Sequence, residues 1–345
     1  MLAFQDKART LLRLWLDQSK PTIFSFHDCL PDVFSGYLEL LITRKYRILS
    51  AAELLEGPRK PGRQAVLTFD DGRRNCWTVI FPLLKKYKIR ASIFVIASRI
   101  SDSQDNYPNL EDFWEGRVSW ENLYLSHRKQ PYLTWKELRQ MRESGLIEVY
   151  SHGLRHEVVP VGSGIMDFQH PGVYEMPVYF DEWYSAGQPV LDSQWGRPVY
   201  ERAWSPLATN AYCPDQSLDL FMNEFVKKNG GFLFFRKKRW RRKLFEYWQQ
   251  HRRLFSFGHF RKNEIQEELG ESLAGSRKII EERVGGDCIF FSLPLYQGLK
   301  EAAAALLAAG YKGVFSGPQN INAGRLGIPV FNRIPGFWLK FLNYI

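Results

Sequence analysis

Two short strings of the chain carry side chains that could hold a metal ion. Asp70 and Asp71 are adjacent carboxylates in the string Thr-Phe-Asp-Asp-Gly, and His152 and His156 lie four residues apart in Ser-His-Gly-Leu-Arg-His. Two histidines and one carboxylate are a sufficient ligand set for a catalytic zinc that keeps an open position for water. The second carboxylate is then free to act as a base. The pattern indicates a metal-assisted hydrolase, provided that the fold brings the two strings together.

Each of these patterns also has a purely structural interpretation. The aspartates could form a turn in which one carboxylate caps the next helix and Gly72 supplies a permissive φ. The histidines could be ordinary core or surface residues, although a helical segment would let one ion reach both. His27 ends an apolar stretch, where it could protonate a leaving amine or simply bond a backbone carbonyl.

The elements that must position these residues alternate between strands and helices. Apolar runs predict strands at residues 22–26, 64–69, 91–96, 146–150, 288–292 and 313–316. Helical periodicity is found at 75–87, 264–284 and 301–309, and Thr134 with Glu137 predicts the capping box of a further helix. Such alternation argues for a parallel sheet or barrel. The candidate residues follow strand ends, where α/β folds place their sites.

The composition is that of an ordinary globular protein. The chain has 345 residues, of which 45% are hydrophobic and 24% charged, and its formal net charge is +10. These values exclude a disordered chain and favour acidic partners. The four cysteines are scattered without a CxxC pair, which gives no thiolate metal site. The first 20 residues lack a secretory pattern, so we expect a cytoplasmic protein, peripheral to the membrane if it touches one.

The alternation breaks between residues 158 and 265, a stretch rich in Pro, Gly, Trp and Tyr. We expect a large insertion here, an amphipathic helix at 1–20, and a main domain formed by 21–157 and 266–345. The insertion contains seven closely spaced cationic side chains, namely Arg236, Lys237, Lys238, Arg239, Arg241, Arg242 and Lys243. A basic, aromatic helix suits an anionic membrane surface or a phosphate-bearing substrate, or is a solvated helix face. We expect no nucleic-acid partner, because the basic run is one local segment.

Taken together, the strings resemble those of the polysaccharide deacetylases with a NodB-homology domain (carbohydrate esterase family 4). Residues 68–72 are similar to the first motif of this family and residues 151–156 to its second. Residues 276–285 followed by 291–298 resemble the helix and third-motif loop of the branch that deacetylates poly-N-acetylglucosamine. The resemblance covers about residues 20–156 and 265–335. The third-motif loop departs from the family because it contains no arginine.

The resemblance implies an α/β fold, a distorted (β/α)7–8 TIM-like barrel, and a divalent metal, usually zinc. By similarity, Asp71, His152 and His156 would be the metal ligands and Asp70 the general base. The resemblance also implies His27 as general acid and an arginine near the base, for which Arg333 is the candidate. A backbone N–H of the loop at Leu295 and Tyr296 would hold the oxyanion.

Three functions agree with these features. The first is an N-deacetylase that removes acetyl from an N-acetylated amino sugar, either in a glycan or in a lipid- or nucleotide-linked precursor that bears phosphate. The second is a deformylase or amidase with the same mechanism on another small amide. The third is a non-catalytic, metal-containing barrel that binds a glycan or a membrane. The presence of Asp70 argues against the third, because binding alone does not need the base.

Overall fold

The computed structural model divides the chain into two compact units, residues 1–156 with 269–345, and residues 157–268. It describes residues 20–56, 62–123, 130–156, 158–171, 192–204, 210–255, 258–262, 265–318 and 326–344. The helix expected at residues 1–20 lies outside these ranges except for its last residue. None of the described helices is both long and apolar enough to cross a membrane.

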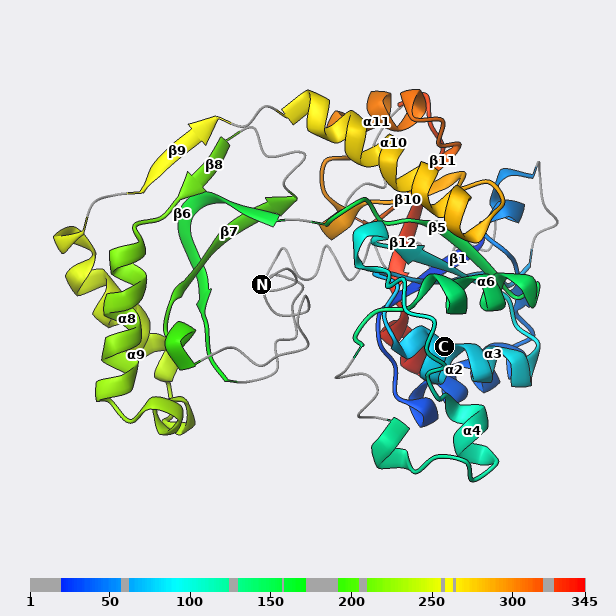
Figure 1. Cartoon of the computed structure of the whole chain (residues 1–345), viewed down its shortest axis with the longest axis horizontal. Helices are drawn as coiled ribbons and strands as arrows, with labels where there is room; N and C mark the ends of the chain where they lie inside the picture. The colour runs from blue at the N-terminus through cyan, green and yellow to red at the C-terminus, as the bar shows by residue number, and fades with distance from the viewer. Residues whose placement is uncertain are drawn as a thin grey trace. The chain divides into compact units, whose positions relative to one another are not determined.

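The first unit is built on a closed ring of parallel strands (Figure 1). Eight strands form one sheet in the order β1-β12-β11-β10-β5-β4-β3-β2, and β1 also pairs with β3, which closes the barrel and leaves β2 at its margin. The strands are β1 (Thr22–Phe26), β2 (Arg47–Ile48), β3 (Gln64–Phe69), β4 (Ala91–Val95), β5 (Ile147–Ser151), β10 (Phe290–Ser292), β11 (Gly313–Ser316) and β12 (Val330–Pro335). The expected TIM-like barrel is confirmed.

Helices between the strands surround this ring (Figure 1). They are α2 (Pro31–Thr43), α3 (Phe81–Tyr87), α4 (Leu110–Trp114), α6 (Trp135–Glu143), α10 (Ile265–Val284) and α11 (Leu299–Ala308). Every residue of β1, β3, β4, β10 and β11 is buried. Strands covered on both faces read as continuous apolar runs, which is why the sequence predicts most of them closely.

Three local features differ from the sequence-based expectations. Residues 75–87 are not one regular helix, since a π-helical turn at Cys76–Ile80 precedes α3. The short helix α4, with Asn109 at its capping box, lies in a stretch where no helix was predicted from the sequence. The strand β12 was not predicted, because its run Val-Phe-Asn-Arg-Ile-Pro places polar residues inside the strand.

In the part that the structure describes, the second unit contains two small antiparallel sheets and two α-helices. β6 (Val158–Phe168) pairs with β7 (Pro198–Trp204), and β8 (Asn210–Cys213) pairs with β9 (His259–Lys262). The helices are α8 (Gln216–Lys228) and α9 (Trp240–His251). Phe168, Leu218, Met222, Val226, Phe234 and Leu244 form its buried core. This unit therefore has a hydrophobic core of its own.

Candidate active site

Most of the predicted site residues of the first unit come from the loops that follow the barrel strands, whereas Arg333 lies within β12. His27 follows β1, Asp70 and Asp71 follow β3, and His152 follows β5. Because all these strands are parallel, their carboxyl ends meet at one end of the barrel, where enzymes of this architecture hold their sites. The fold thus brings together two strings that are 80 residues apart in the sequence.

Three of these side chains form a compact set of ligand atoms. Asp71, His152 and His156 are all buried, and one ligand atom from each lies within 4.8 Å of the others. Both carboxylate oxygens of Asp71 are buried and accept no hydrogen bond from the described residues. Buried polar atoms are nearly always satisfied, so two that lack a hydrogen-bond partner among the described residues call for an explanation such as a bound ion. The donor set and these two oxygens therefore fit a divalent cation.

The orientation of His152 suits a metal ligand. Its Nδ1 lies 2.9 Å from the backbone oxygen of Ser292. A carbonyl can only accept, so Nδ1 carries the proton and Nε2 has the free lone pair. That Nε2 lies 3.5 Å from Oδ1 of Asp71. The end of β10 thus fixes the imidazole tautomer that binds a cation.

The two histidines approach each other on a loop and not on a helix. Gly153 has a φ of 95° and His156 a φ of 54°, yet the two imidazole ring centroids are only 4.9 Å apart. The helical segment considered from the spacing is therefore not what brings them together. Asp71 also has a left-handed φ, 72°. Such backbone strain in non-glycine residues clusters at functional sites.

Burial lowers the pKa of both histidines to about 4. For His152 the loss of water is the largest cause and the charge of Asp70 opposes it; for His156 the neighbouring His152 adds to the effect of burial. Both imidazoles are therefore neutral at pH 7. The neutral form is the one that coordinates a metal, so the site needs to release no proton from these rings at that pH.

Asp70 is held by a second set of buried groups. Nη1 of Arg333 donates to Oδ1 of Asp70 at 2.7 Å, and the hydroxyl of Ser292 donates to the same oxygen at 3.3 Å. Nη2 of Arg333 donates to Oγ of Ser292 at 2.7 Å, which closes a triangle. Burial is the largest single influence and would raise the pKa of Asp70, but the charge and hydrogen bond of Arg333, together with His152 and His27, outweigh it and hold this pKa well below its usual range. Ser292 belongs to the string 291–298 singled out in the sequence, but no role was predicted for it.

The remaining predicted site residues lie around these groups. His27 is 42% exposed, with its Nε2 4.0 Å from Oδ2 of Asp71. Leu295 and Tyr296 follow β10 with φ values of 54° and 57°. The N–H of Tyr296 donates to the carbonyl of Leu293 at 3.1 Å, and its hydroxyl lies 2.9 Å from Oγ of Ser25. The structure therefore leaves His27 facing both the ligand set and solvent.

The basic residues of the second unit lie at the start of α9. Arg236–Arg239 precede the helix and the other three cations are on its first turn. All seven are exposed. Some contact aromatic rings, since the guanidinium of Arg236 lies 5.2 Å from the ring of Phe232 and that of Arg241 lies 4.3 Å from Trp240. Arg241 also pairs with Asp167 at 2.9 Å. The segment thus remains mostly open to solvent.

Comparison with known proteins places the resemblance in the first half of the chain. Residues 57–169 match the family model described as polysaccharide deacetylase. The poly-beta-1,6-N-acetyl-D-glucosamine N-deacetylases of Escherichia coli K12 and O157:H7 are each 27% identical over 111 residues. That match covers 31% of this chain and 15% of the length of each relative.

Two solved structures are similar to this chain, and the first of them, with the higher TM-score, shows a shared fold. A de-N-acetylase from Aggregatibacter actinomycetemcomitans has a TM-score of 0.51 and 17% identity, and covers 94% of this chain and 99% of its own. A deacetylase domain from Bordetella bronchiseptica has a TM-score of 0.49 and 15% identity, with coverage of 92% and 97%. The family model that matches residues 57–169 thus agrees with the resemblance seen in the sequence, and the matched region includes the string with both aspartates and the string with both histidines.

Proposed function

We propose that this chain is a metal-dependent N-deacetylase that hydrolyses the acetamido group of an N-acetylated amino sugar in a glycan. The observation that supports it most is the joining of two buried sets at one end of the barrel. One set, Asp71, His152 and His156, fits a divalent cation. The other, Arg333 and Ser292, holds the carboxylate of Asp70. The E. coli relatives named above are poly-N-acetylglucosamine N-deacetylases, and the family model that matches residues 57–169 is described as polysaccharide deacetylase.

A cation such as Zn²⁺ held by these three ligands would polarise a carbonyl and lower the pKa of a nearby water to about 7. Asp70 accepts the proton of the water as its oxygen attacks the acetyl carbon. Arg333 keeps this carboxylate ionised and oriented, at the cost of making it a weak base. Proton transfer to Asp70 is therefore expected to accompany C–O bond formation and not to precede it.

The collapse of the tetrahedral intermediate requires a proton for the leaving amine. His27 is half-exposed and lies beside Asp71, so it can take a proton from solvent and pass it to the amine nitrogen as the C–N bond breaks. The products are acetate and the free amino sugar. Of the two predicted oxyanion donors, the N–H of Leu295 is the better candidate, because that of Tyr296 already donates to Leu293.

The basic segment of the second unit supports a finer version of this proposal, in which the glycan is attached to a phosphate-bearing carrier. Residues 227–254 contain 11 Lys and Arg side chains and one acidic residue, Glu246. Such a density of cations favours a pyrophosphate carrier or the anionic membrane surface in which a lipid carrier lies. A cytoplasmic location, where such precursors are made, remains a prediction.

Acetate release by zinc-loaded protein tests both the N-deacetylase activity and the phosphate-bearing carrier. Three substrate pools are compared: free N-acetylhexosamine oligomers, nucleotide-linked N-acetylhexosamines and lipid-pyrophosphate-linked ones, each against Asp70→Asn. We expect release from at least one pool and at least a hundredfold loss in the variant, with zinc content unchanged. Release from free oligomers alone would reject the carrier. No release from any pool by zinc-loaded protein would reject the deacetylase and favour another small amide.

A further inference from the structure

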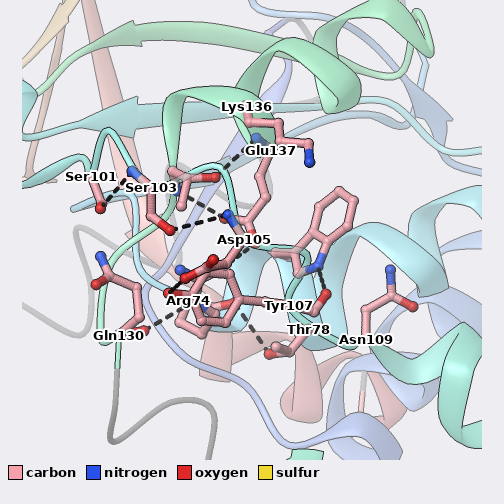
Figure 2. Close-up of polar contacts among 12 residues, drawn as sticks. Arg74, Thr78, Ser101, Ser103, Asp105, Tyr107, Asn109, Gln130, Lys136 and Glu137 are labelled. Atoms are coloured by element: carbon pink, nitrogen blue, oxygen red, sulfur yellow. Dashed lines mark hydrogen bonds and ion pairs between the residues drawn. The ribbon is translucent and has the colours of Figure 1, made fainter. Parts of the chain in front are cut away.

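Arg74 is a buried cation that the proposed chemistry does not use. It lies three residues after Asp71 and is 1% exposed. Its guanidinium is surrounded by acceptors: Nε donates to the carbonyl of Gln130 at 3.0 Å, Nη2 donates to that of Tyr132 at 2.7 Å, and Nη1 pairs with Glu137. Figure 2 shows Arg74 close to Gln130 and Glu137. A buried charge persists only with partners of this kind, and its loss leaves the partner charge unpaired.

The segment that accepts from Arg74 also pairs with the backbone beside the metal ligands. The N–H of Arg74 donates to the carbonyl of Pro131 at 2.8 Å, and the N–H of Leu133 donates to that of Gly72 at 2.9 Å. Residues 130–133 therefore bind the loop through both the side chain and the backbone of Arg74. Asp71 and Gly72 both have a φ of 72°. A strained conformation at Asp71 is kept only where its surroundings fix it.

Glu137 connects this loop to the element that leads to the histidines. Its second carboxylate oxygen accepts the N–H of Thr134 at 2.8 Å, and the hydroxyl of Thr134 accepts the N–H of Glu137 at 3.1 Å. This capping box begins α6, which is followed by β5 and then His152. One ion pair thus joins the loop of Asp71 to the start of the helix and strand that deliver His152.

The pair is also shielded from water. The ring of Tyr107 lies over the Arg74 guanidinium, 4.0 Å from its centroid. Nε1 of Trp77 donates to the carbonyl of Tyr107 at 2.7 Å and holds that residue in place. In a site without water the ion pair keeps its strength and its direction.

We infer that Arg74 and Glu137 are positioning residues that set the separation between Asp71 and the two histidines, and with it the affinity for a divalent cation. The inference rests on the proposed metal site. Neither side chain is a ligand, so the effect passes through the backbone of residues 71–74 and through α6. Residues that orient metal ligands typically change metal affinity by about 10- to 100-fold when they are replaced.

Direct metal titration tests this inference independently of turnover. Zn²⁺ affinity is measured by competition with a chromophoric chelator, and the visible spectrum of Co²⁺-loaded protein reports the ligand geometry. The variants are Arg74→Met, which leaves Glu137 unpaired, and Arg74→Met/Glu137→Gln, which keeps an oxygen for the capping box but removes both charges. Arg277→Met is the matched control, because Arg277 joins α10 to the carbonyl of Ala309 at 2.8 Å and pairs with Glu281, without touching the site loops.

We expect both Arg74 variants to bind Zn²⁺ at least tenfold more weakly and to change the Co²⁺ spectrum, while Arg277→Met keeps the wild-type values. Urea unfolding of the metal-free proteins separates positioning from folding, since the double variant should recover much of the stability that Arg74→Met loses. A double variant that recovers stability and binds Zn²⁺ as tightly as wild type would overturn this inference but not the proposed function. A wild-type protein that binds neither ion would overturn the proposed function as well.

Discussion

At the scale of single residues, the site depends on the buried ion pair between Asp70 and Arg333. Asp70 and Arg333 are 3% and 0% exposed and form an ion pair at 2.7 Å. Removing one member of such a pair typically costs about 3–5 kcal/mol, because the other charge stays buried without compensation. We therefore expect Arg333→Met to lower the free energy of unfolding by about this amount at pH 7, as measured with urea. Asp70→Asn/Arg333→Met should recover most of the loss, and a double variant as unstable as Arg333→Met would contradict this account.

The buried histidines predict how the metal-free protein responds to acid. Their folded-state pKa is about 4, below the ordinary value of 6.5, so the unfolded chain binds more protons between these two values. The contribution of these histidines to the free energy of unfolding should therefore be fully present above pH 6.5. It should fall as the pH drops toward 4, by up to about 3 kcal/mol for each histidine. Chemical unfolding of metal-free protein at several pH values measures this slope. His156→Gln should make the dependence of the unfolding free energy on pH less steep. His259 is an exposed residue of the second unit, so His259→Gln should leave this dependence unchanged.

The sequence alone identified most of the residues that meet at the site, but not the contacts that hold them. Asp70, Asp71, His152 and His156 stand out because they follow apolar strands at short spacings. The ion pair between Arg74 and Glu137 joins positions 63 residues apart, and no local pattern marks two charges as partners. Glu137 was visible only as the capping-box partner of Thr134. Long-range pairs of this kind become apparent only when the chain is folded.

At the scale of elements, strands covered on both faces were the easiest to predict. The bounds of β1, β3 and β11 match the apolar runs because helices and neighbouring strands exclude water from every residue. In β12 the pattern fails, since Arg333 is buried by its pairing with Asp70 and not by being apolar. Hydrophobicity therefore could not reveal the strand that carries Arg333, the partner of Asp70.

The turn after β3 gives a test of how tightly this element is packed. Gly72 and Gly145 have nearly the same left-handed φ, 72° and 74°. A Cβ at Gly72 would lie 2.9 Å from side-chain atoms of Ile100 and Val95, whereas one at Gly145 would meet nothing within 4 Å. We expect Gly145→Ala to cost about 1–2 kcal/mol from backbone strain alone, and Gly72→Ala about 1–3 kcal/mol more from overpacking. Thermal or urea unfolding compares the stability of the two variants. Equal losses of stability would mean that the turn at Gly72 accommodates a Cβ without overpacking.

At the scale of the whole molecule, the proposed ligands all belong to the first compact unit. They come from two loops, residues 70–74 and 151–156, that only the closed barrel brings together. A cation that binds the folded form alone stabilises it by about 2.7 kcal/mol when its concentration is 100 times its dissociation constant. Because the ion must be held by both loops at once, its stabilising effect should appear in both loops together. It should not appear in one loop without the other.

Hydrogen–deuterium exchange with and without Zn²⁺ measures this effect along the chain. We expect slower exchange in peptides that contain residues 70–74 and 151–156, and unchanged exchange in peptides from 158–171 and 210–255, which contribute no ligand to the set. Asp71→Asn should abolish the protection of both loops together, since a cation held by two histidines alone binds weakly. Protection of only the histidine loop in the wild-type protein would mean that Asp71 is not a ligand. Its two unsatisfied carboxylate oxygens would then need another partner.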